Sequence, residues 1–334
     1  MIITLAPLRI SFVGGGTDLK EFYSRYPGRV ISTTVDKFVY IAVNQAHLLN
    51  RFIIKYTETE IAKHPSEFKH PLFREALTKM GINKGLEIAS FADLPAKTGL
   101  GSSSSFSVAL FKALFAYVGK PVGKHEAAEA ASELEINILK EPIGKQDQYA
   151  AAFGGFNIFQ FNGDGTVTVE PIFLDFRVRS ALENHLLFYF TGITRSAESV
   201  LSDQKSKIED NFETYKKMSD SVPVFKNKIM SGDFKGMAEM LHEGWLRKKT
   251  LSSKISSPVI DTLYEAGIKA GAWGGKILGA GGGGCLMFLV DPKHRQEVMA
   301  VLENEAMRAG LDEFRRIPLK FTQSGADILF NSSV

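Results

Sequence analysis

The stretch LPAKTGLGSSSSFSVAL, residues 94–110, says more about the fold than any other part of the sequence. Gly99 and Gly101 precede a run of four serines, and residues 106–118 then show the apolar spacing of a helix. The first turn of such a helix offers free N–H groups at the positive end of the helix dipole, which favours a bound phosphate. Serine hydroxyls there can contact a phosphate oxygen or ligate Mg²⁺. A serine N-cap after a flexible linker is the alternative, but it accounts for one serine and not four.

A second glycine-rich loop lies near the N-terminus, in PLRISFVGGGTDL, residues 7–19. A β-rich segment runs there into Gly14, Gly15 and Gly16 and then into Thr17-Asp18. Three glycines permit positive φ angles and let a ligand approach the backbone closely. A tight hairpin turn is the alternative interpretation. Asp18 beside this loop would accept hydrogen bonds from ligand hydroxyls, or would cap the helix that follows.

The third loop is in KILGAGGGGCLMFLV, residues 276–290. Residues 279–284 satisfy G-x-G-x-x-G, which raises the alternative of a dinucleotide-dependent oxidoreductase. A strand-like segment follows the pattern, however, where a dinucleotide fingerprint needs a helix. Apolar strands on both sides favour a loop that packs under a phosphate or a neighbouring loop. No match to G-x-x-x-x-G-K-[ST] occurs, which disfavours a Walker-type NTPase.

Hydrophobic patterning gives the order of elements along the chain. A length of 334 residues suffices for two domains. The pattern predicts a boundary near residues 177–185 and mainly helical structure from the strand at 186–190 to about residue 270. The other predicted strands are 2–13, 30–44, 52–58, 86–91, 156–161, 166–174 and 313–319, with helices at 125–140 and 293–309.

Composition argues against several classes of function. A formal net charge of +3 gives no sign of a nucleic-acid or membrane partner. The single cysteine, Cys285, excludes an intramolecular disulfide and a cysteine-based metal cage. We see no leader-like segment at the start of the chain and no apolar run of about 18 residues, so we expect a cytoplasmic protein. A homodimer is left open.

The three loops, in this order and spacing, resemble the three signature motifs of the GHMP kinase superfamily, named for galactokinase, homoserine kinase, mevalonate kinase and phosphomevalonate kinase. The resemblance covers essentially the whole chain, and PxRxxFxGxxTD and GLGSSSS are its most specific elements. It implies an α+β architecture of two domains, residues 1–180 with the first two motifs and 181–334 with the third. It also implies an active site in the cleft between the domains, with ATP and Mg²⁺ as cofactors.

The same resemblance implies roles for individual residues. Within EPIGKQDQYAAAFGG, residues 141–155, Asp147 stands where galactokinase-like members carry the catalytic aspartate, and Arg9 matches the basic residue beside it. Glu135 and Ser103 match the ligands of Mg²⁺; without the resemblance, Glu135 would be interpreted as an exposed helix acid. The implied ATP contacts are Lys97, Gly99, Leu100, Gly101, Ser102, Ser103 and Ser104, and the implied sugar contacts are Gly15, Gly16, Thr17, Asp18, Arg195, Gly282 and Gly283.

Within the superfamily, the details resemble the heptose 7-phosphate kinases of bacterial nucleotide-heptose synthesis. The resemblance lies in GGGTDL (14–19), FYFTGITRSAESVLSDQ (188–204), HEGWLRKKTLSSKIS (242–256) and KAGAWGGKILGAGGGG (269–284). GGGTD also replaces the GEHTD of galactokinases, which argues against galactose.

This resemblance implies phosphorylation of the anomeric hydroxyl of D-glycero-D-manno-heptose 7-phosphate to the 1,7-bisphosphate. Arg195, Lys248 and Lys249 would supply cations for the phosphate already on the sugar. The alternative is that they are solvated helix charges. Two further alternatives stay open: a kinase for an unphosphorylated sugar such as fucose, and a catalytically inactive sensor that binds sugar and ATP.

Overall fold

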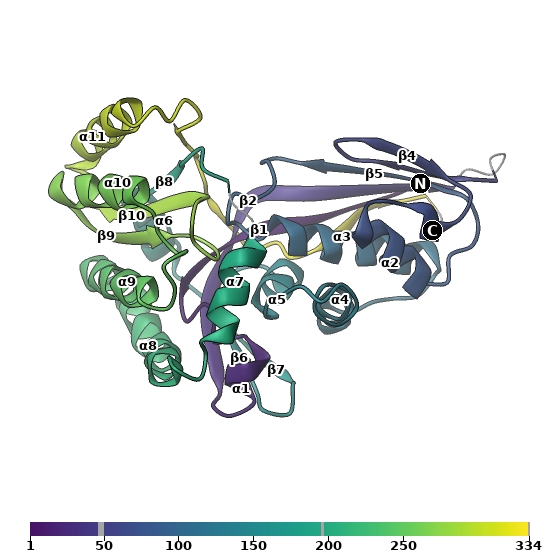
Figure 1. The fold of residues 1–334 in the computed structure, drawn as a ribbon, viewed down its shortest axis with the longest axis horizontal. Helices are drawn as coiled ribbons and strands as arrows, with labels where there is room; N and C mark the ends of the chain where they lie inside the picture. Colours follow the sequence, from purple (N-terminus) through teal and green to yellow (C-terminus); the bar gives the residue numbers. More distant parts are fainter. Residues whose placement is uncertain (46–49, 195–196, 333–334) are drawn as a thin grey trace.

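The computed structural model describes residues 1–45, 50–194 and 197–332, and its strands form two separate sheets (Figure 1). The larger sheet has nine strands in the order β13-β1-β2-β5-β3-β4, with β12 and β6 also pairing with β2, and β7 with β6. Its strands are β1 (Ile2–Val13), β2 (Gly28–Gln45), β3 (Phe52–Lys55), β4 (Thr59–Ala62), β5 (Leu86–Ala92), β6 (Asn157–Phe161), β7 (Val167–Pro171), β12 (Phe321–Thr322) and β13 (Asp327–Asn331).

Four helices cover one face of this sheet, below it in Figure 1: α2 (Pro71–Lys79), α3 (Ser102–Tyr117), α4 (Lys124–Ser132) and α5 (Gln146–Phe153). Helix α3 packs directly on β1 and β2. From Ala6 to Val13, β1 is buried at every position rather than at alternate ones. The reason is that α3 and α5 lie on one side of β1, while α8 (Phe212–Ser231) and α9 (Phe234–Lys249) contact it as well.

The smaller sheet consists of β8 (Leu186–Phe190), β9 (Ala272–Ile277), β10 (Cys285–Val290) and β11 (Arg315–Arg316). Its order is β11-β8-β10-β9, and it lies on the left in Figure 1. The inner strand β10 reads CLMFLV and is buried throughout, as expected of a strand covered on both faces. Helices α8 and α9 lie below this sheet in the figure, with α10 (Pro258–Lys269) and α11 (Arg295–Arg308) above it. The remaining elements are α1 (Lys20–Tyr23), α6 (Phe176–His185), α7 (Ala197–Ser206) and the 3₁₀ turn Pro65–Glu67.

The mixed architecture of helices and sheets confirms the α+β prediction. Two local predictions are wrong. The helix predicted over 125–140 ends as an α-helix at Ser132 and continues as a π-helical stretch, Glu133–Ile138. The strand predicted over 313–319 shrinks to the two residues of β11.

The last strands return to the larger sheet. β13 pairs with β1, with Ile2 opposite Asn331, and β12 pairs with β2. A division into residues 1–180 and 181–334 stays a prediction. By their pairing, strands β12 and β13 belong to the first of these parts.

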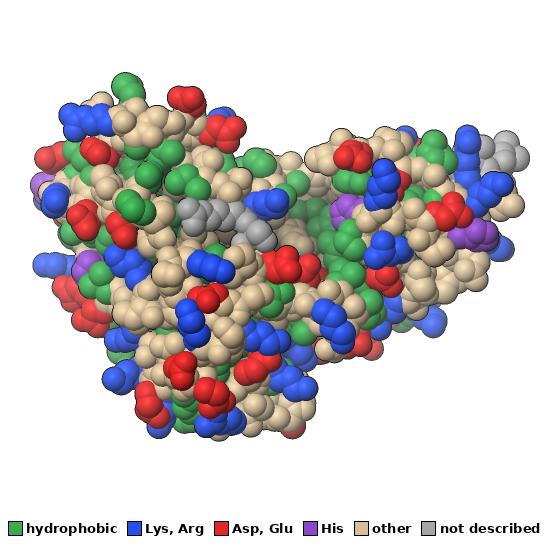
Figure 2. Space-filling model, in the orientation of Figure 1, with side chains coloured by type: hydrophobic (Ala, Val, Ile, Leu, Met, Phe, Trp, Pro, Cys, Tyr) green, Lys and Arg blue, Asp and Glu red, His purple; other side chains and the backbone are tan. Residues whose placement is uncertain are grey.

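The surface of the molecule is hollowed between the part that contains the smaller sheet and the part that contains the larger sheet (Figure 2).

Candidate active site

The second and third glycine loops are in direct backbone contact. The N–H of Cys285 donates to the carbonyl of Thr98 at 2.9 Å. A Cβ on Gly99 would come within 2.6 Å of the Leu278 carbonyl oxygen, and one on Gly284 within 2.7 Å of the Thr98 oxygen. Only glycine permits two segments of backbone to approach so closely. The third loop is therefore held against the second, one of the two roles predicted for it.

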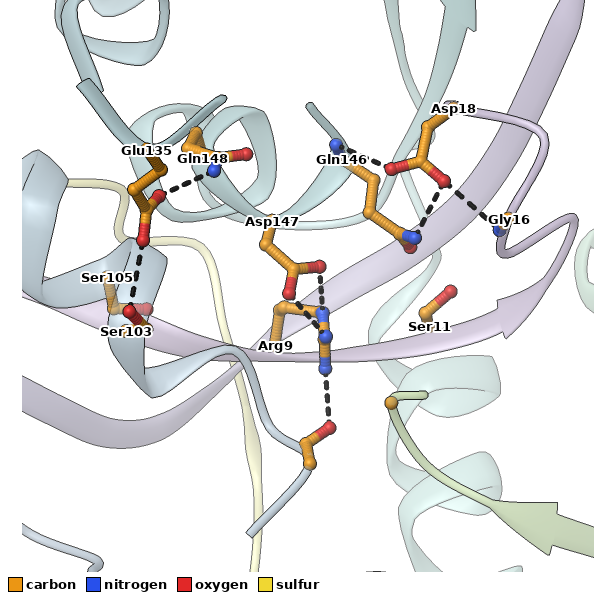
Figure 3. Close-up of polar contacts among 12 residues, drawn as sticks. Arg9, Ser11, Gly16, Asp18, Ser103, Ser105, Glu135, Gln146, Asp147 and Gln148 are labelled. Carbon is orange, nitrogen blue, oxygen red and sulfur yellow. Dashed lines mark hydrogen bonds and ion pairs between the residues drawn. The ribbon is translucent and has the colours of Figure 1, made fainter. Parts of the chain in front are cut away.

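Arg9 and Asp147 form a bidentate ion pair in which Nε and Nη2 of Arg9 each lie 2.6 Å from one carboxylate oxygen (Figure 3). The third nitrogen, Nη1, donates to the Gly99 carbonyl at 2.7 Å. Arg9 is buried on β1, whereas the Asp147 side chain keeps 23% of its surface exposed. A paired arginine holds a carboxylate in one orientation, and the exposed fraction leaves that carboxylate open to a ligand.

Glu135 lies buried in the π-helical stretch, a type of helix irregularity that is frequent at functional sites. Its carboxylate accepts a hydrogen bond from the Ser103 hydroxyl at 3.0 Å and another from the Gln148 amide at 2.5 Å. Burial, together with the nearby charge of Asp147, raises the pKa of Glu135 to about 7, against the opposing effect of hydrogen bonds from Gln148, Ser103 and Ser104. A buried acid of this kind is a candidate functional group, and its neutralisation by a cation would relieve the cost of burial.

Asp18 is also buried, at the end of the first glycine loop. Its carboxylate accepts hydrogen bonds from the Gly16 N–H at 3.0 Å and from the side-chain amide of Gln146 at 2.9 Å. Burial and the nearby charge of Asp147 raise the pKa of Asp18 to about 6. Asp18 is thus an acceptor site, and it does not cap α1, whose N-cap residue Leu19 makes no side-chain cap bond.

The first turn of α5 connects these groups. Gln146 reaches Asp18, Asp147 reaches Arg9, and Gln148 reaches Glu135. Successive side chains of a helix point about 100° apart, so three neighbours serve three different partners. Figure 3 shows Asp147 between the Glu135 pair and the Asp18 pair. The two glutamines were missed in the sequence, where the only signal was the unusual Q-D-Q context.

The serine run opens α3 as predicted, and its members differ in role. Gly101 precedes the helix with φ +77°, and Ser103 is exposed at its first turn. Ser104 is buried, and the hydroxyl of Ser105 donates to the Pro7 carbonyl at 2.8 Å. Lys97 is exposed with φ +65° at the mouth of the loop.

The remaining predicted ATP contacts differ in how far they are buried. Ser102 is half-buried in the first turn of α3, and Gly99 is half-buried as well. Leu100 is fully buried, and its carbonyl accepts the Arg9 N–H at 2.9 Å. Leu100 therefore anchors the loop to β1 through its backbone.

The residues predicted to contact sugar are only partly brought together. Gly15, Gly16 and Asp18 line a cavity of about 70 Å³ that also reaches Asp147. The Thr17 hydroxyl instead lies 2.8 Å from the carbonyl oxygens of Gly14 and Arg29, where it holds the turn.

Other predicted contacts lie away from this cavity. The N–H of Gly282 donates to the Ile255 carbonyl at 2.7 Å, and a Cβ on Gly283 would lie 2.3 Å from the Ile193 oxygen. Neither glycine lines the cavity, whereas Gly279 and Ala280 of the same loop do. Arg195 lies outside the described residues.

The two candidate lysines of α9, Lys248 and Lys249, lie in different surroundings. Lys248 is buried and lines the cavity, and its ammonium group donates to the Gly279 carbonyl at 2.6 Å. Lys249 points elsewhere and forms an ion pair with Asp261 at 3.0 Å. Lys276, on β9, lines the same cavity and was not a candidate in the sequence.

The oxygens of Ser103 and Glu135 have the chemistry that Mg²⁺ requires, since a hydroxyl and a carboxylate are hard ligands. In residues 1–45, 50–194 and 197–332 no group of three or more His, Cys, Asp or Glu side chains is placed to hold a metal ion. An ion bound by Glu135 would therefore complete its shell with water and phosphate oxygens, as Mg²⁺ commonly does at nucleotide sites.

Gly101 gives a prediction about the Arg9–Asp147 pair. A Cβ on Gly101 would lie 3.1 Å from Cγ and 3.3 Å from Nε of Arg9. We expect Gly101→Ala to displace the guanidinium and to lower kcat at least about tenfold, because small misplacements at a reacting centre are costly. The measurement is steady-state kinetics together with thermal unfolding.

Gly119→Ala is the matched control for this variant. Gly119 has a similar φ of +72°, but a Cβ there would meet nothing within 4 Å. Both variants should lose about 1–2 kcal/mol of stability from the left-handed backbone. If both also lost the same fraction of kcat, the contact with Arg9 would be irrelevant.

Comparisons with known proteins identify the family. The model of the GHMP kinases N terminal domain matches residues 69–155, and that of the GHMP kinases C terminal matches residues 225–309. The chain is 31% identical over 322 residues to the D-glycero-alpha-D-manno-heptose 7-phosphate kinase of Campylobacter jejuni, covering 91% of this chain and 94% of that one. The chain belongs to the GHMP kinases.

Two further proteins are similar to this GHMP kinase. The crystal structure of a D-glycero-D-manno-heptose 1-phosphate kinase from Bacteroides thetaiotaomicron superposes with a TM-score of 0.81, 26% identity and 99% coverage of both chains. The L-fucokinase/L-fucose-1-P guanylyltransferase of Bacteroides fragilis is 29% identical over 231 residues, 66% of this chain and 24% of that protein.

Membership confirms the predicted enzyme class. This GHMP kinase is a sugar kinase, a phosphotransferase with a hydroxyl group as acceptor and ATP as the phosphate donor. The alternative of a dinucleotide-dependent oxidoreductase is wrong, because the loop at 279–284 is followed by strand β10 and not by the helix that a dinucleotide-binding fingerprint requires. Among the helices of the described residues, none is long and apolar enough to span a bilayer.

Proposed function

We propose that this GHMP kinase transfers the γ-phosphate of ATP to the anomeric hydroxyl of D-glycero-D-manno-heptose 7-phosphate. The product would be the 1,7-bisphosphate, an intermediate for nucleotide-activated heptose. The observation that carries the proposed chemistry is the bidentate Arg9–Asp147 pair, which faces a cavity lined by Gly15, Gly16 and Asp18.

Asp147 is the general base in this proposal. As the sugar oxygen attacks the γ-phosphorus, its proton passes to the Asp147 carboxylate, and the bond between phosphorus and the β,γ-bridging oxygen breaks to release ADP. Arg9 holds that carboxylate in one orientation through two hydrogen bonds and balances the developing negative charge. Asp18, supported by Gln146, accepts hydrogen bonds from other hydroxyls of the sugar and so orients the reacting one.

The phosphates of ATP are assigned to residues 97–104. The first turn of α3 presents unpaired backbone N–H groups at Ser102, Ser103 and Ser104, which suit an anionic ligand. Ser103 and Glu135 would hold Mg²⁺, which supplies charge neutralisation for the β- and γ-phosphates. The buried Glu135 carboxylate supports this assignment, because a bound cation would offset the burial that, as the largest cause, raises its pKa to about 7.

The names of two relatives support a substrate that already carries a phosphate. The Campylobacter relative is called a heptose 7-phosphate kinase and the Bacteroides structure a heptose 1-phosphate kinase, so both names specify a phosphorylated heptose. The buried Lys248, which lines the same cavity as Asp147, adds a cation on the sugar side. The fucokinase relative keeps a free-sugar kinase as the second candidate, although its likeness covers a smaller share of the chain.

A comparison of substrates tests the proposal. Charge-assisted contacts to phosphate are worth about 1.5–3 kcal/mol, so heptose 7-phosphate should have a kcat/KM at least about tenfold above heptose itself. The measurement is ADP release with a panel of sugars and sugar phosphates, with the product identified by NMR. Equal efficiency on the phosphorylated and free sugars would favour the free-sugar kinase.

A further inference from the structure

Two buried lysines lie near the active site. Lys248 on α9 and Lys276 on β9 keep only 7% and 8% of their surface exposed. Among the described residues, no carboxylate lies within ion-pair distance of either ammonium group. Burying an unpaired cation is costly, and proteins normally place a counter-charge beside it.

The ammonium groups are held in place by backbone carbonyls. Lys276 donates to the carbonyls of Ser11 and Phe12 at 3.1 and 2.9 Å, and Lys248 donates to that of Gly279 at 2.6 Å. An ammonium group has three donors, so each lysine retains unused hydrogen-bonding capacity. Burial, followed by repulsion from Lys248 and Arg9, lowers the pKa of Lys276 well below its usual value.

Unpaired donors gather around the same place. The Ser11 hydroxyl is buried without a partner in the described structure, and so is the indole N–H of Trp245. Ser11 lines the small cavity with Lys248 and Lys276, and Trp245 lines a neighbouring cavity of about 320 Å³. Buried polar groups are almost always satisfied, so several unsatisfied donors together indicate a missing acceptor.

The two cavities adjoin, because Gly15, Lys248 and Lys276 line both of them. The larger one extends between the end of β1 and helices α8 and α9. Cations outnumber acids on its walls, which carry Lys217, Arg247, Lys248 and Lys276 against Asp220 and Glu243. Neither cavity is lined by a residue of the 97–105 loop.

We propose that Lys248, Lys276 and the Ser11 hydroxyl form an anion subsite for a phosphate that the sugar substrate already carries. The sugar then spans the junction, with its reacting hydroxyl at Asp147 and its phosphate at the two lysines. This inference rests on the proposed function and assigns the recognition of the substrate phosphate to Lys248 and Lys276 rather than to Lys249. It makes the lysine pair the determinant of the preference for phosphorylated over free sugar.

The test uses Ser11→Ala and Lys276→Met in the full-length enzyme. Ser11→Ala removes a hydroxyl that has no partner among the described residues, so folding should be unaffected. Lys276→Met removes the charge at similar length, and its folding is checked by thermal unfolding. In Lys276→Met, the ratio of kcat/KM for heptose 7-phosphate to that for heptose should fall at least about tenfold, and in Ser11→Ala about threefold or more, mainly through KM.

Lys249→Met is the matched control, because Lys249 is the sequence neighbour of Lys248 and is paired with Asp261. It should leave the ratio unchanged. If the ratio of the two kcat/KM values is unchanged in both Ser11→Ala and folded Lys276→Met, the proposed subsite is refuted. If Lys276→Met fails to fold, the ratio in Ser11→Ala and in Lys248→Met decides.

A binding measurement separates this inference from the proposed reaction. Inorganic phosphate, titrated calorimetrically without ATP, should bind the wild type and the Lys249→Met variant, and its affinity should fall at least about tenfold in Lys276→Met. Lysine-dependent phosphate binding by an enzyme that phosphorylates no heptose phosphate would support the subsite and refute the assigned substrate. Equal phosphate affinity in wild type and Lys276→Met would refute the subsite and leave the assigned reaction intact.

Discussion

Asp147→Asn should lower kcat by at least about a hundredfold while ATP binding stays nearly unchanged. Asparagine has the size of aspartate and its oxygen can still accept one of the two bonds from Arg9, but an amide cannot take the proton of the sugar hydroxyl. General-base catalysis is typically worth about 10²–10⁴-fold, which sets the size of the loss. Steady-state ADP release gives kcat, and calorimetric titration gives the affinity for ATP.

Asp164→Asn is a suitable control for this substitution. Asp164 is an exposed turn residue that bonds Thr166 and has no contact with the site. Its kcat should equal that of the wild type. Near-normal turnover of Asp147→Asn would remove Asp147 from the mechanism, and a loss confined to KM for ATP would assign it to nucleotide binding instead.

Glu135→Gln should raise the Mg²⁺ concentration for half-maximal rate at least about tenfold. The amide retains an acceptor for Ser103 but loses the negative charge that a divalent cation requires. The expected size is the 10–100-fold effect of changing groups around metal sites. The measurement is the initial rate against free Mg²⁺ at fixed ATP.

The thermal stability of Glu135→Gln shows whether Glu135 is a metal ligand or an acid that stabilises the fold. Burial raises the pKa of Glu135 to about 7, so at pH 8 the carboxylate is ionised in an environment that disfavours the charge. The neutral amide removes that cost, and we expect no loss of Tm in Glu135→Gln at pH 8. Glu133→Gln, a half-exposed acid two residues earlier, should change neither property. An unchanged Mg²⁺ dependence in Glu135→Gln would leave Glu135 as a structural residue.

Local features of the sequence were sufficient for the long strands and for the glycine loops, but not for the π-helical stretch 133–138 or for the short strands near the C-terminus. The apolar, β-rich residues 2–13 and the all-apolar CLMFLV segment predict strands, and β1 and β10 form there. The order of the three loops predicts the family, since each loop needs glycine or serine at positions where backbone meets backbone or ligand. Arg9, in the first motif, and Asp147, in the segment 141–155 between the motifs, were candidates through the resemblance to the family.

Other features depend on contacts between segments far apart in the chain. Thr17 was expected to contact sugar, but its hydroxyl holds the turn against Arg29. Gly282 and Gly283 were expected at the substrate and instead pack against Ile255 and Ile193. A run of glycines indicates that another group lies close to the backbone, but it does not indicate whether that group is a ligand or another segment of the chain.

The sequence by itself determined the three loops and the residue types needed for phosphoryl transfer, because these depend on local conformation and side-chain chemistry. Its resemblance to a known family implied the α+β class. Only the tertiary structure decided that β13 returns to β1, and that one turn of α5 serves Asp18, Arg9 and Glu135. It alone separated Lys248 from Lys249 and brought Lys276 to Ser11. The physical reason is that burial and unpaired charge are properties of a side chain's surroundings, and these surroundings come from segments distant in sequence.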